Sequence, residues 1–162
     1  MTEYDGFRVA RETDRGVATI TLDVPDKFNR VSMGARDELA KVFGELGGDE
    51  SVRVVVLRGA GDAAFTAGGD VGMFMERDAE TLSHLHVNVA APERCPKPVI
   101  AQLHGYCFGV GLELAKLARG CVALDGIRRS RVIGRREQKR KAEQEFEHGD
   151  FEARGEWAIV QA

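Results

Sequence analysis

Two glycine-rich turns, each following a short apolar run and each opening a helical pattern, constrain this chain more than any other feature. The first reads FTAGGDV at residues 65–71, and the second reads HGYCFGVGLELAKLA at residues 104–118. Glycine lets the backbone approach a bound group closely, and the first turn of a helix carries N–H groups without partners. The pair therefore predicts a cradle of backbone N–H groups for one developing negative charge. Glu113 falls about one turn into the second helix, which predicts a carboxylate beside this cradle.

Strand and helix patterns alternate along the first 118 residues, which predicts an α/β fold. Apolar and polar residues alternate over 7–12 and 17–22, with a turn at Asp14 to Gly16 between them, as is typical of a β-hairpin. Ser32 is expected to cap a helix over 33–46 that Gly47 and Gly48 end. The other expected elements are a strand at 52–57 that is covered on both faces, short helices at 71–75 and 79–91, a strand at 99–103 and a helix from Val110.

Composition excludes several classes of protein. A net charge of −3 offers no whole-chain attraction for nucleic acid or an anionic membrane. No apolar run has membrane-spanning length and the first residues lack the pattern of a secretory signal, which predicts a cytoplasmic protein. Cys95, Cys107 and Cys121 lack the spacing of a metal or redox site, so no metal is expected. Cys107 lies in the second glycine segment and is interpreted as a small packed residue rather than a nucleophile.

The order and spacing of the two turns resemble the enoyl-CoA hydratase/isomerase (crotonase) superfamily. Its AGxD turn matches residues 67–70, and its G-x-G-x-E-L-A segment matches residues 109–115. The segments at 25–29 and 96–101 extend the resemblance to roughly residues 7–118. The resemblance implies a crotonase-like ββα superhelix of which only the N-terminal portion is present, so residues 1–118 are expected to form the region that binds a CoA thioester. It also implies a trimer whose C-terminal layer is missing here.

The resemblance further implies an enzyme of fatty acid metabolism that acts on an acyl-CoA thioester through an enolate. The backbone amides of Gly69 and Val110 would form the oxyanion hole, and Glu113 would be the general acid/base, its pKa raised by partial burial beside the acyl group. A glutamate at this position favours an enoyl-CoA hydratase, a lyase, over an isomerase. Hydrolase and decarboxylase branches share the hole and stay open, and the acyl chain is not indicated.

The residues expected to contact CoA come from the same matched segments. The family's CoA-contacting turn corresponds to Ala67 and Gly68. Asp70 follows in this turn and is grouped with the CoA-binding residues, although capping of the next helix is its expected role. Gly109 lies on the second turn, and Lys27 matches a segment that lines the CoA groove, although a solvated lysine is the alternative reading. No cofactor is implied beyond the coenzyme A that forms part of the substrate.

Residues 119–162 depart from the family and are expected to be a divergent charged tail, disordered or frame-shifted. Residues 125–141 are basic and residues 142–156 are acidic. The family's second acidic motif, F-G-x-P-E, has only a weak match here, which ends at Glu137. An inactive or weakly active truncated CoA-binding remnant is therefore the alternative to an active enzyme. Nucleic-acid binding by the basic run is disfavoured because no aromatic residues accompany it.

Overall fold

A computed structural model of the chain describes residues 1–69 and 88–123, which fall within one compact unit, Met1–Asp125. Several sequence-based predictions lie outside these residues. They are Asp70, the helix at 71–75, most of the helix at 79–91, and the charged tail from 125 with Glu137. At the end of the second predicted helix, residues 88–89 are helical and helix α5 covers Ala91–Arg94.

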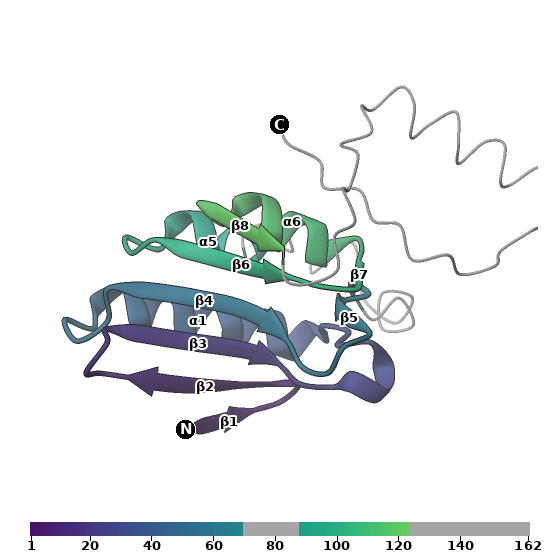
Figure 1. The fold of residues 1–162 in the computed structure, drawn as a ribbon, viewed down its shortest axis with the longest axis horizontal. Coiled ribbons are helices and arrows are strands. Elements are labelled where there is room, and N and C mark those ends of the chain that lie inside the picture. Colours follow the sequence, from purple (N-terminus) through teal and green to yellow (C-terminus); the bar gives the residue numbers. More distant parts are fainter. Residues whose placement is uncertain (70–87, 124–162) are drawn as a thin grey trace, which may run out of the picture. The chain divides into compact units, whose positions relative to one another are not determined.

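The main sheet has six strands in the order β1-β2-β3-β4-β6-β8, and the helices lie against one of its faces (Figure 1). β1, β2 and β3 pair antiparallel, while β3, β4, β6 and β8 run parallel. Helix α1 connects β3 to β4 and helix α6 connects β6 to β8, as parallel neighbours require. The bounds are β1 Thr2–Tyr4, β2 Phe7–Glu12, β3 Val17–Leu22, η1 Pro25–Lys27, α1 Met33–Gly48, β4 Val54–Gly59, β6 Val99–Leu103, α6 Val110–Leu117 and β8 Gly120–Ala123.

Most of the predicted elements are confirmed, and two boundaries move. The β2–β3 hairpin forms around the predicted turn, β6 has the predicted bounds, and the Ser32 side chain caps α1 by accepting from the amide of Ala35 at 3.1 Å. α1 extends two residues beyond the predicted 33–46 and ends at Gly48, the second of the two glycines that were expected to end it. Gly47 is buried and a Cβ there would lie 2.7 Å from Pro96 Cδ, so glycine serves close packing at this position. β4 begins at Val54, where its pairing with Val17 starts, rather than at residue 52.

A second, two-stranded sheet was not predicted. It consists of β5 (Ala64–Thr66) and β7 (Tyr106–Cys107), which pair in parallel. Each of these short strands follows a long strand of the main sheet, so β6, β7 and α6 make one strand–strand–helix unit. Strands of two and three residues are too short to show a period in the sequence, and this accounts for the omission.

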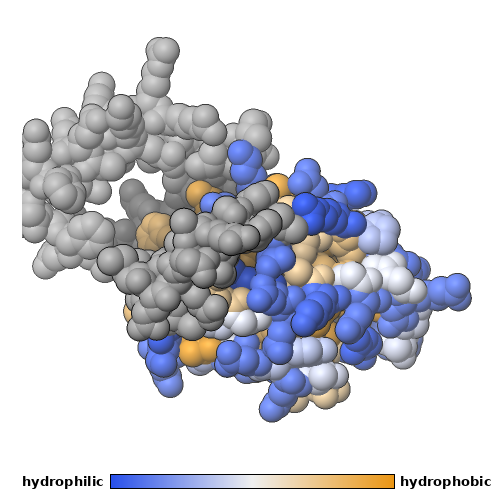
Figure 2. Space-filling view, turned by 180° about the vertical axis from the view of Figure 1, so that it is seen from behind, coloured by the Kyte–Doolittle hydropathy of each residue, from blue (hydrophilic) through white to orange (hydrophobic). Residues whose placement is uncertain are grey.

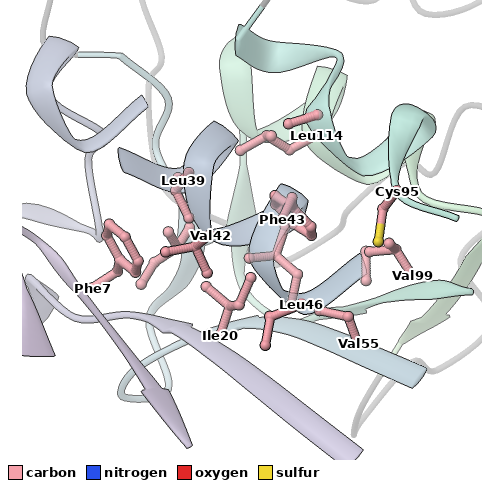
Figure 3. Close-up of a cluster of buried hydrophobic side chains, with 14 of the residues drawn as sticks. Phe7, Ile20, Leu39, Val42, Phe43, Leu46, Val55, Cys95, Val99 and Leu114 are labelled. Carbon is pink, nitrogen blue, oxygen red and sulfur yellow. The ribbon is translucent and has the colours of Figure 1, made fainter. Parts of the chain in front are cut away.

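The hydrophobic core lies between the main sheet and α1, with α6 and the Cys95 segment closing one end (Figure 3). Leu39, Val42, Phe43 and Leu46 form the buried stripe of α1, and each is at most 2% exposed. In β4, by contrast, burial alternates, with Val55 and Leu57 buried and their neighbours half-buried or exposed. The strand was predicted to be covered on both faces; one face is buried, whereas the other is only half-buried at Val54 and Val56 and exposed at Arg58. Figure 2 shows the side opposite to the view of Figure 1, where hydrophilic residues dominate the described surface.

Candidate functional site

The two glycine turns meet because the strands that precede them pair in parallel. β5 and β7 pair along Ala64–Tyr106 and Thr66–Cys107, so the segments that follow leave the small sheet at the same end. Phe108 donates its amide to the carbonyl oxygen of Thr66 at 3.1 Å. A Cβ on Gly68 would lie 2.9 Å from the Phe108 carbonyl oxygen, which means that the two backbones are in direct contact.

Glycine is required at both turns. Gly68 has a φ of +102° and Gly109, the residue before α6, has φ and ψ of 50° and −123°. L-residues that carry a side chain rarely adopt such backbone conformations. Gly111, in the first turn of α6, faces β5, where a Cβ would lie 2.4 Å from Thr66 Cγ2. The three glycines thus let the start of α6 pack directly against the end of β5.

Two backbone amides at this junction have no acceptor among residues 1–69 and 88–123. One is the amide of Gly69, and the other is that of Val110. Val110 is the first residue of α6, so its N–H is among those that a helix leaves without an internal partner. Both residues are half-buried. The residues predicted to form an oxyanion hole therefore lie on contacting turns and keep their donors available to a ligand within the described part of the chain.

Glu113 lies in the first turn of α6, close to the predicted place, but it is exposed rather than partly buried. Its amide donates to the Gly109 carbonyl oxygen at 3.2 Å, which ties the residue to the second turn. A charged residue that the sequence analysis missed lies in its neighbourhood. Arg36 of α1 is 3% exposed, and burial lowers the pKa of its guanidinium while attraction to Glu113, and then to Asp37, raises it.

The residues predicted to contact CoA surround the turns. Lys27, Ala67 and Gly109 are exposed and Gly68 is buried. Ala67 donates its amide to the Phe28 carbonyl oxygen at 2.8 Å, so the Lys27 segment is joined directly to the first turn.

Three aromatic rings line the same region. Phe28 and Tyr106 meet edge to face with ring centroids 5.6 Å apart, and Tyr106 lies 5.8 Å from the half-exposed Phe108. Cys107, which lies between Tyr106 and Phe108 in the sequence, is half-buried and packs against the core.

Residues 1–69 and 88–123 contain no group of three or more histidine, cysteine, aspartate or glutamate side chains arranged to hold a metal ion. No helix within these ranges has the length and apolar character needed to cross a membrane. The junction of the two glycine turns is therefore the candidate site in these ranges.

Fold, motif order and turn geometry together define a crotonase-fold protein, and the chain belongs to the enoyl-CoA hydratase/isomerase family, whose profile matches residues 12–125. The chain is 38% identical over 122 residues to the fatty acid oxidation complex subunit alpha of Shewanella frigidimarina, covering 71% of this chain and 17% of that protein.

Solved structures of the family superpose on the described fold. An enoyl-CoA hydratase/carnithine racemase from Magnetospirillum magneticum matches with a TM-score of 0.67 and 34% identity, covering 75% of this chain and 47% of that one. An enoyl-CoA hydratase from Mycobacterium smegmatis matches with a TM-score of 0.66 and 36% identity, covering 73% and 47%. The chain thus spans somewhat less than half the length of these structures and a much smaller share of the curated relative.

Proposed function

We propose that this chain binds an acyl-CoA thioester and stabilises the enolate of that thioester, with the amides of Gly69 and Val110 as the oxyanion hole. The observation that carries the proposal is that both amides lie without an acceptor among the described residues on two turns whose backbones touch. Donors that are already oriented stabilise an oxyanion without having to reorganise during the reaction. The start of α6 adds its partial positive charge at Val110.

Glu113 is the proposed general acid/base of an enoyl-CoA hydratase. Its place one turn into α6, with its amide bonded to Gly109, brings a carboxylate onto the turn that carries Val110. Hydration adds water across the carbon–carbon double bond next to the thioester, so a group must take a proton from water and another must supply one to carbon. The buried guanidinium of Arg36 is attracted to Glu113, which supports a place for this carboxylate near the start of α6.

The proposed CoA contacts are the backbone at Ala67, Gly68 and Gly109 and the side chain of Lys27, with Asp70 as the next residue along the first turn. The hydrogen bond between Ala67 and Phe28 supports this grouping, since it joins the Lys27 loop to the turn. Coenzyme A enters as part of the substrate and no further cofactor is proposed. Assembly into a trimer, as the family resemblance implies, is proposed for the whole protein.

The oxyanion hole is tested by removing one N–H group without disturbing the helix. Val110→Pro deletes the amide hydrogen at the first position of α6, where proline is well tolerated, and Val110→Ala trims the side chain but keeps the N–H group. The ligands are acetoacetyl-CoA, whose thioester readily forms an enolate, and CoA itself, which has no carbonyl at that place.

Val110→Pro is expected to lower the affinity for acetoacetyl-CoA by about 100-fold, in line with the loss of one oxyanion donor, while CoA binding changes much less. Val110→Ala should leave the ratio of the two affinities near the wild-type value. Calorimetry measures both affinities. A Val110→Pro protein that still prefers acetoacetyl-CoA as strongly as the wild type would refute the role of this amide.

The second candidate is a CoA-binding module without significant turnover. It is favoured by one observation in the sequence, namely that the 162 residues contain no F-G-x-P-E segment to supply a second carboxylate. Such a module would bind CoA and acetoacetyl-CoA as above but would not hydrate an enoyl-CoA. A steady-state hydration assay therefore separates the two candidates.

A further inference from the structure

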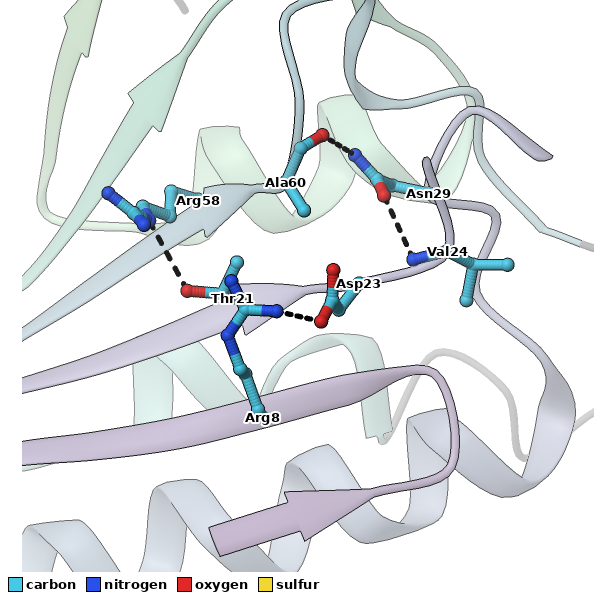
Figure 4. Close-up of polar contacts among 7 residues, drawn as sticks. All are labelled: Arg8, Thr21, Asp23, Val24, Asn29, Arg58 and Ala60. Carbon is cyan, nitrogen blue, oxygen red and sulfur yellow. Dashed lines mark hydrogen bonds and ion pairs between the residues drawn. The ribbon is translucent and has the colours of Figure 1, made fainter. Parts of the chain in front are cut away.

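We infer that Asn29 is the positioning residue of the Gly69 half of the proposed oxyanion hole, so this inference rests on the proposed function. Asn29 is 1% exposed and lies in the loop between η1 and α1 (Figure 4). Its side chain makes three hydrogen bonds to backbone groups. Nδ2 donates to the carbonyl oxygens of Ala60 at 2.8 Å and Ala64 at 2.7 Å, and Oδ1 accepts from the amide of Val24 at 3.0 Å.

These three bonds use every hydrogen of the Asn29 amide and join three parts of the chain. Val24 directly precedes η1, Ala60 follows β4, and Ala64 is the first residue of β5. The backbone closes the segment 24–29 as well, because Asn29 N–H donates to the Val24 carbonyl oxygen at 2.9 Å. A different loop conformation would break these bonds and leave buried polar groups unsatisfied, which costs free energy. The loop therefore has little freedom to change its conformation.

The loop conformation itself is one that depends on support. Phe28 and Asn29 have φ angles of 51° and 53°, in the left-handed region that few non-glycine residues occupy. Asparagine tolerates this region better than most residues, whereas an aromatic residue does not. The hydrogen bonds of Asn29 therefore hold the neighbouring Phe28 in an orientation that it would not adopt by itself.

Residues on both sides of Asn29 bind the first glycine turn. Phe28 accepts from the amide of Ala67 at 2.8 Å, and Val31 donates to the carbonyl oxygen of Gly68 at 2.8 Å. The Gly68 carbonyl and the Gly69 amide belong to one peptide unit, which is planar, and the described residues contain no cis peptide bond. In a trans peptide the C=O and N–H groups point in opposite directions. The bond from Val31 therefore fixes the direction in which Gly69 N–H points.

Asn29 is connected to the second turn only indirectly, through β5 and its pairing with β7. Ala64 pairs with Tyr106 across the small sheet, and the Asn29 amide holds the Ala64 carbonyl from the other side. A Cβ on Gly59 would lie 2.8 Å from Asn29 Nδ2, so the end of β4 is shaped to admit this amide. Asn29 thus fixes both the position of β5 and, through Val31, the direction of the Gly69 N–H bond.

Two substitutions test the inference. Asn29→Gly removes all three side-chain bonds while glycine keeps the left-handed backbone accessible. Asn29→Asp keeps the acceptor for Val24 but places an oxygen, without a hydrogen, opposite the carbonyl oxygens of Ala60 and Ala64. The matched control is Thr21→Val on β3, because Thr21 is also buried, at 3% exposed, and its hydroxyl accepts from Arg58 Nε at 3.3 Å without touching either turn (Figure 4).

The first readout is amide hydrogen exchange followed by NMR, which needs no ligand. Both Asn29 variants are expected to speed exchange at Val31 and Ala67 by at least about tenfold, while amides within β6 keep their protection. Thr21→Val should leave Val31 and Ala67 unchanged. Unchanged exchange at these two amides in a folded Asn29 variant would overturn the inference.

The second readout is the ratio of affinities for acetoacetyl-CoA and CoA. Misplacing the Gly69 amide is expected to lower this ratio by about tenfold or more in both Asn29 variants, and not in Thr21→Val. A faster exchange with an unchanged ratio would overturn the positioning role. If the wild-type protein shows no preference for acetoacetyl-CoA, the proposed oxyanion hole fails there, before any variant is compared, and exchange alone then decides whether Asn29 orients the turn.

Discussion

At the scale of single residues, Asp49 is the clearest electrostatic feature outside the site. It follows the last residue of α1, and its Oδ1 accepts from the hydroxyl of Ser51 at 2.6 Å and from the Ser51 amide at 2.9 Å. The Ser51 hydroxyl contributes most to holding the pKa of Asp49 below its ordinary value, followed by the Ser51 amide, and the charges of Arg11 and Lys97 add to this. The ionised carboxylate is therefore the form that favours the turn.

This lowered pKa fixes the sign of a pH effect. The contribution of Asp49 to stability is fully present above the pKa of an unfolded aspartate, about 3.9, and is lost as the pH falls through the lower pKa of the folded state. Ser51→Ala is expected to move the pKa of Asp49 upward, and Ser51→Thr, which keeps a hydroxyl, to leave it near the wild-type value. An NMR titration of the Asp49 carboxyl carbon measures both. No upward movement in Ser51→Ala would mean that the charges of Arg11 and Lys97 dominate.

Single residues also mark the limit of what the sequence could predict at the site. Gly69, Val110 and Glu113 could be proposed as site residues because each lies within a short motif whose spacing is visible in the sequence. Asn29 lies in a matched segment too, but its partners at Ala60 and Ala64 are more than thirty residues away, and only the folded chain brings them together. Arg36 could not be recognised because it occupies a helical stripe that reads as core, where a buried charge is exceptional.

At the scale of elements, α1 offers two glycines that differ only in the space around them. Gly44 is exposed and a Cβ there would meet nothing within 4 Å, whereas a Cβ on Gly47 would lie 2.7 Å from Pro96 Cδ. Gly44→Ala is expected to raise the free energy of unfolding by about 0.5–1 kcal/mol, because alanine reduces the freedom of the unfolded chain. Gly47→Ala should lower it by about 1–3 kcal/mol, since the proline ring cannot yield as a flexible side chain would.

Urea unfolding of the two α1 variants measures these changes. The same substitution on the same helix is expected to act with opposite signs, so each variant is the control for the other. Equal stabilisation by both would show that α1 and the Cys95–Pro96 segment separate easily. In that case the packing seen at Gly47 would contribute little to stability.

Element boundaries show which physical signals the sequence carries. β2, β3 and β6 could be predicted because alternating or continuous apolar residues run for five or six positions. β5 and β7 are shorter than one period of any such pattern, and they form because the long strands before them bring them side by side. Gly47 and Gly48 were read as a helix end, yet the close approach of Pro96 explains the glycine at 47 equally well.

At the scale of the whole molecule, the described strands and helices form one layered arrangement in which helices cover one face of the sheet (Figure 1). The fold class could be predicted from the order of the two turns along the chain, and the family match and the similar solved structures confirm it. β8, at Gly120–Ala123, continues the parallel sheet beyond residue 118 by pairing with β6. This strand could not be predicted from the sequence because it is only four residues long and precedes a strongly charged segment.

The last prediction concerns turnover by the chain as a whole. Hydration requires one group to take a proton from the attacking water and another to supply a proton to carbon. A general acid–base group typically contributes about 100-fold to 10,000-fold to the rate. Only Glu113 brings a carboxylate onto the second turn within residues 88–123, and no F-G-x-P-E segment occurs in the 162 residues. We therefore expect hydration of a short trans-2-enoyl-CoA to be at least about 100-fold slower than in a full-length relative.

The residual rate of that reaction distinguishes an enzyme from a binding module. Glu113→Gln is expected to abolish it, because glutamine cannot exchange a proton with water in this way, whereas Glu45→Gln, an exposed position on α1, should leave it unchanged. Loss of the enoyl thioester absorbance follows the reaction in steady state. Turnover as fast as that of a full-length relative would mean that another acid, such as Glu137, supplies the second proton transfer. A residual rate that survives Glu113→Gln would remove Glu113 from the reaction while leaving the oxyanion hole to be judged by Val110→Pro.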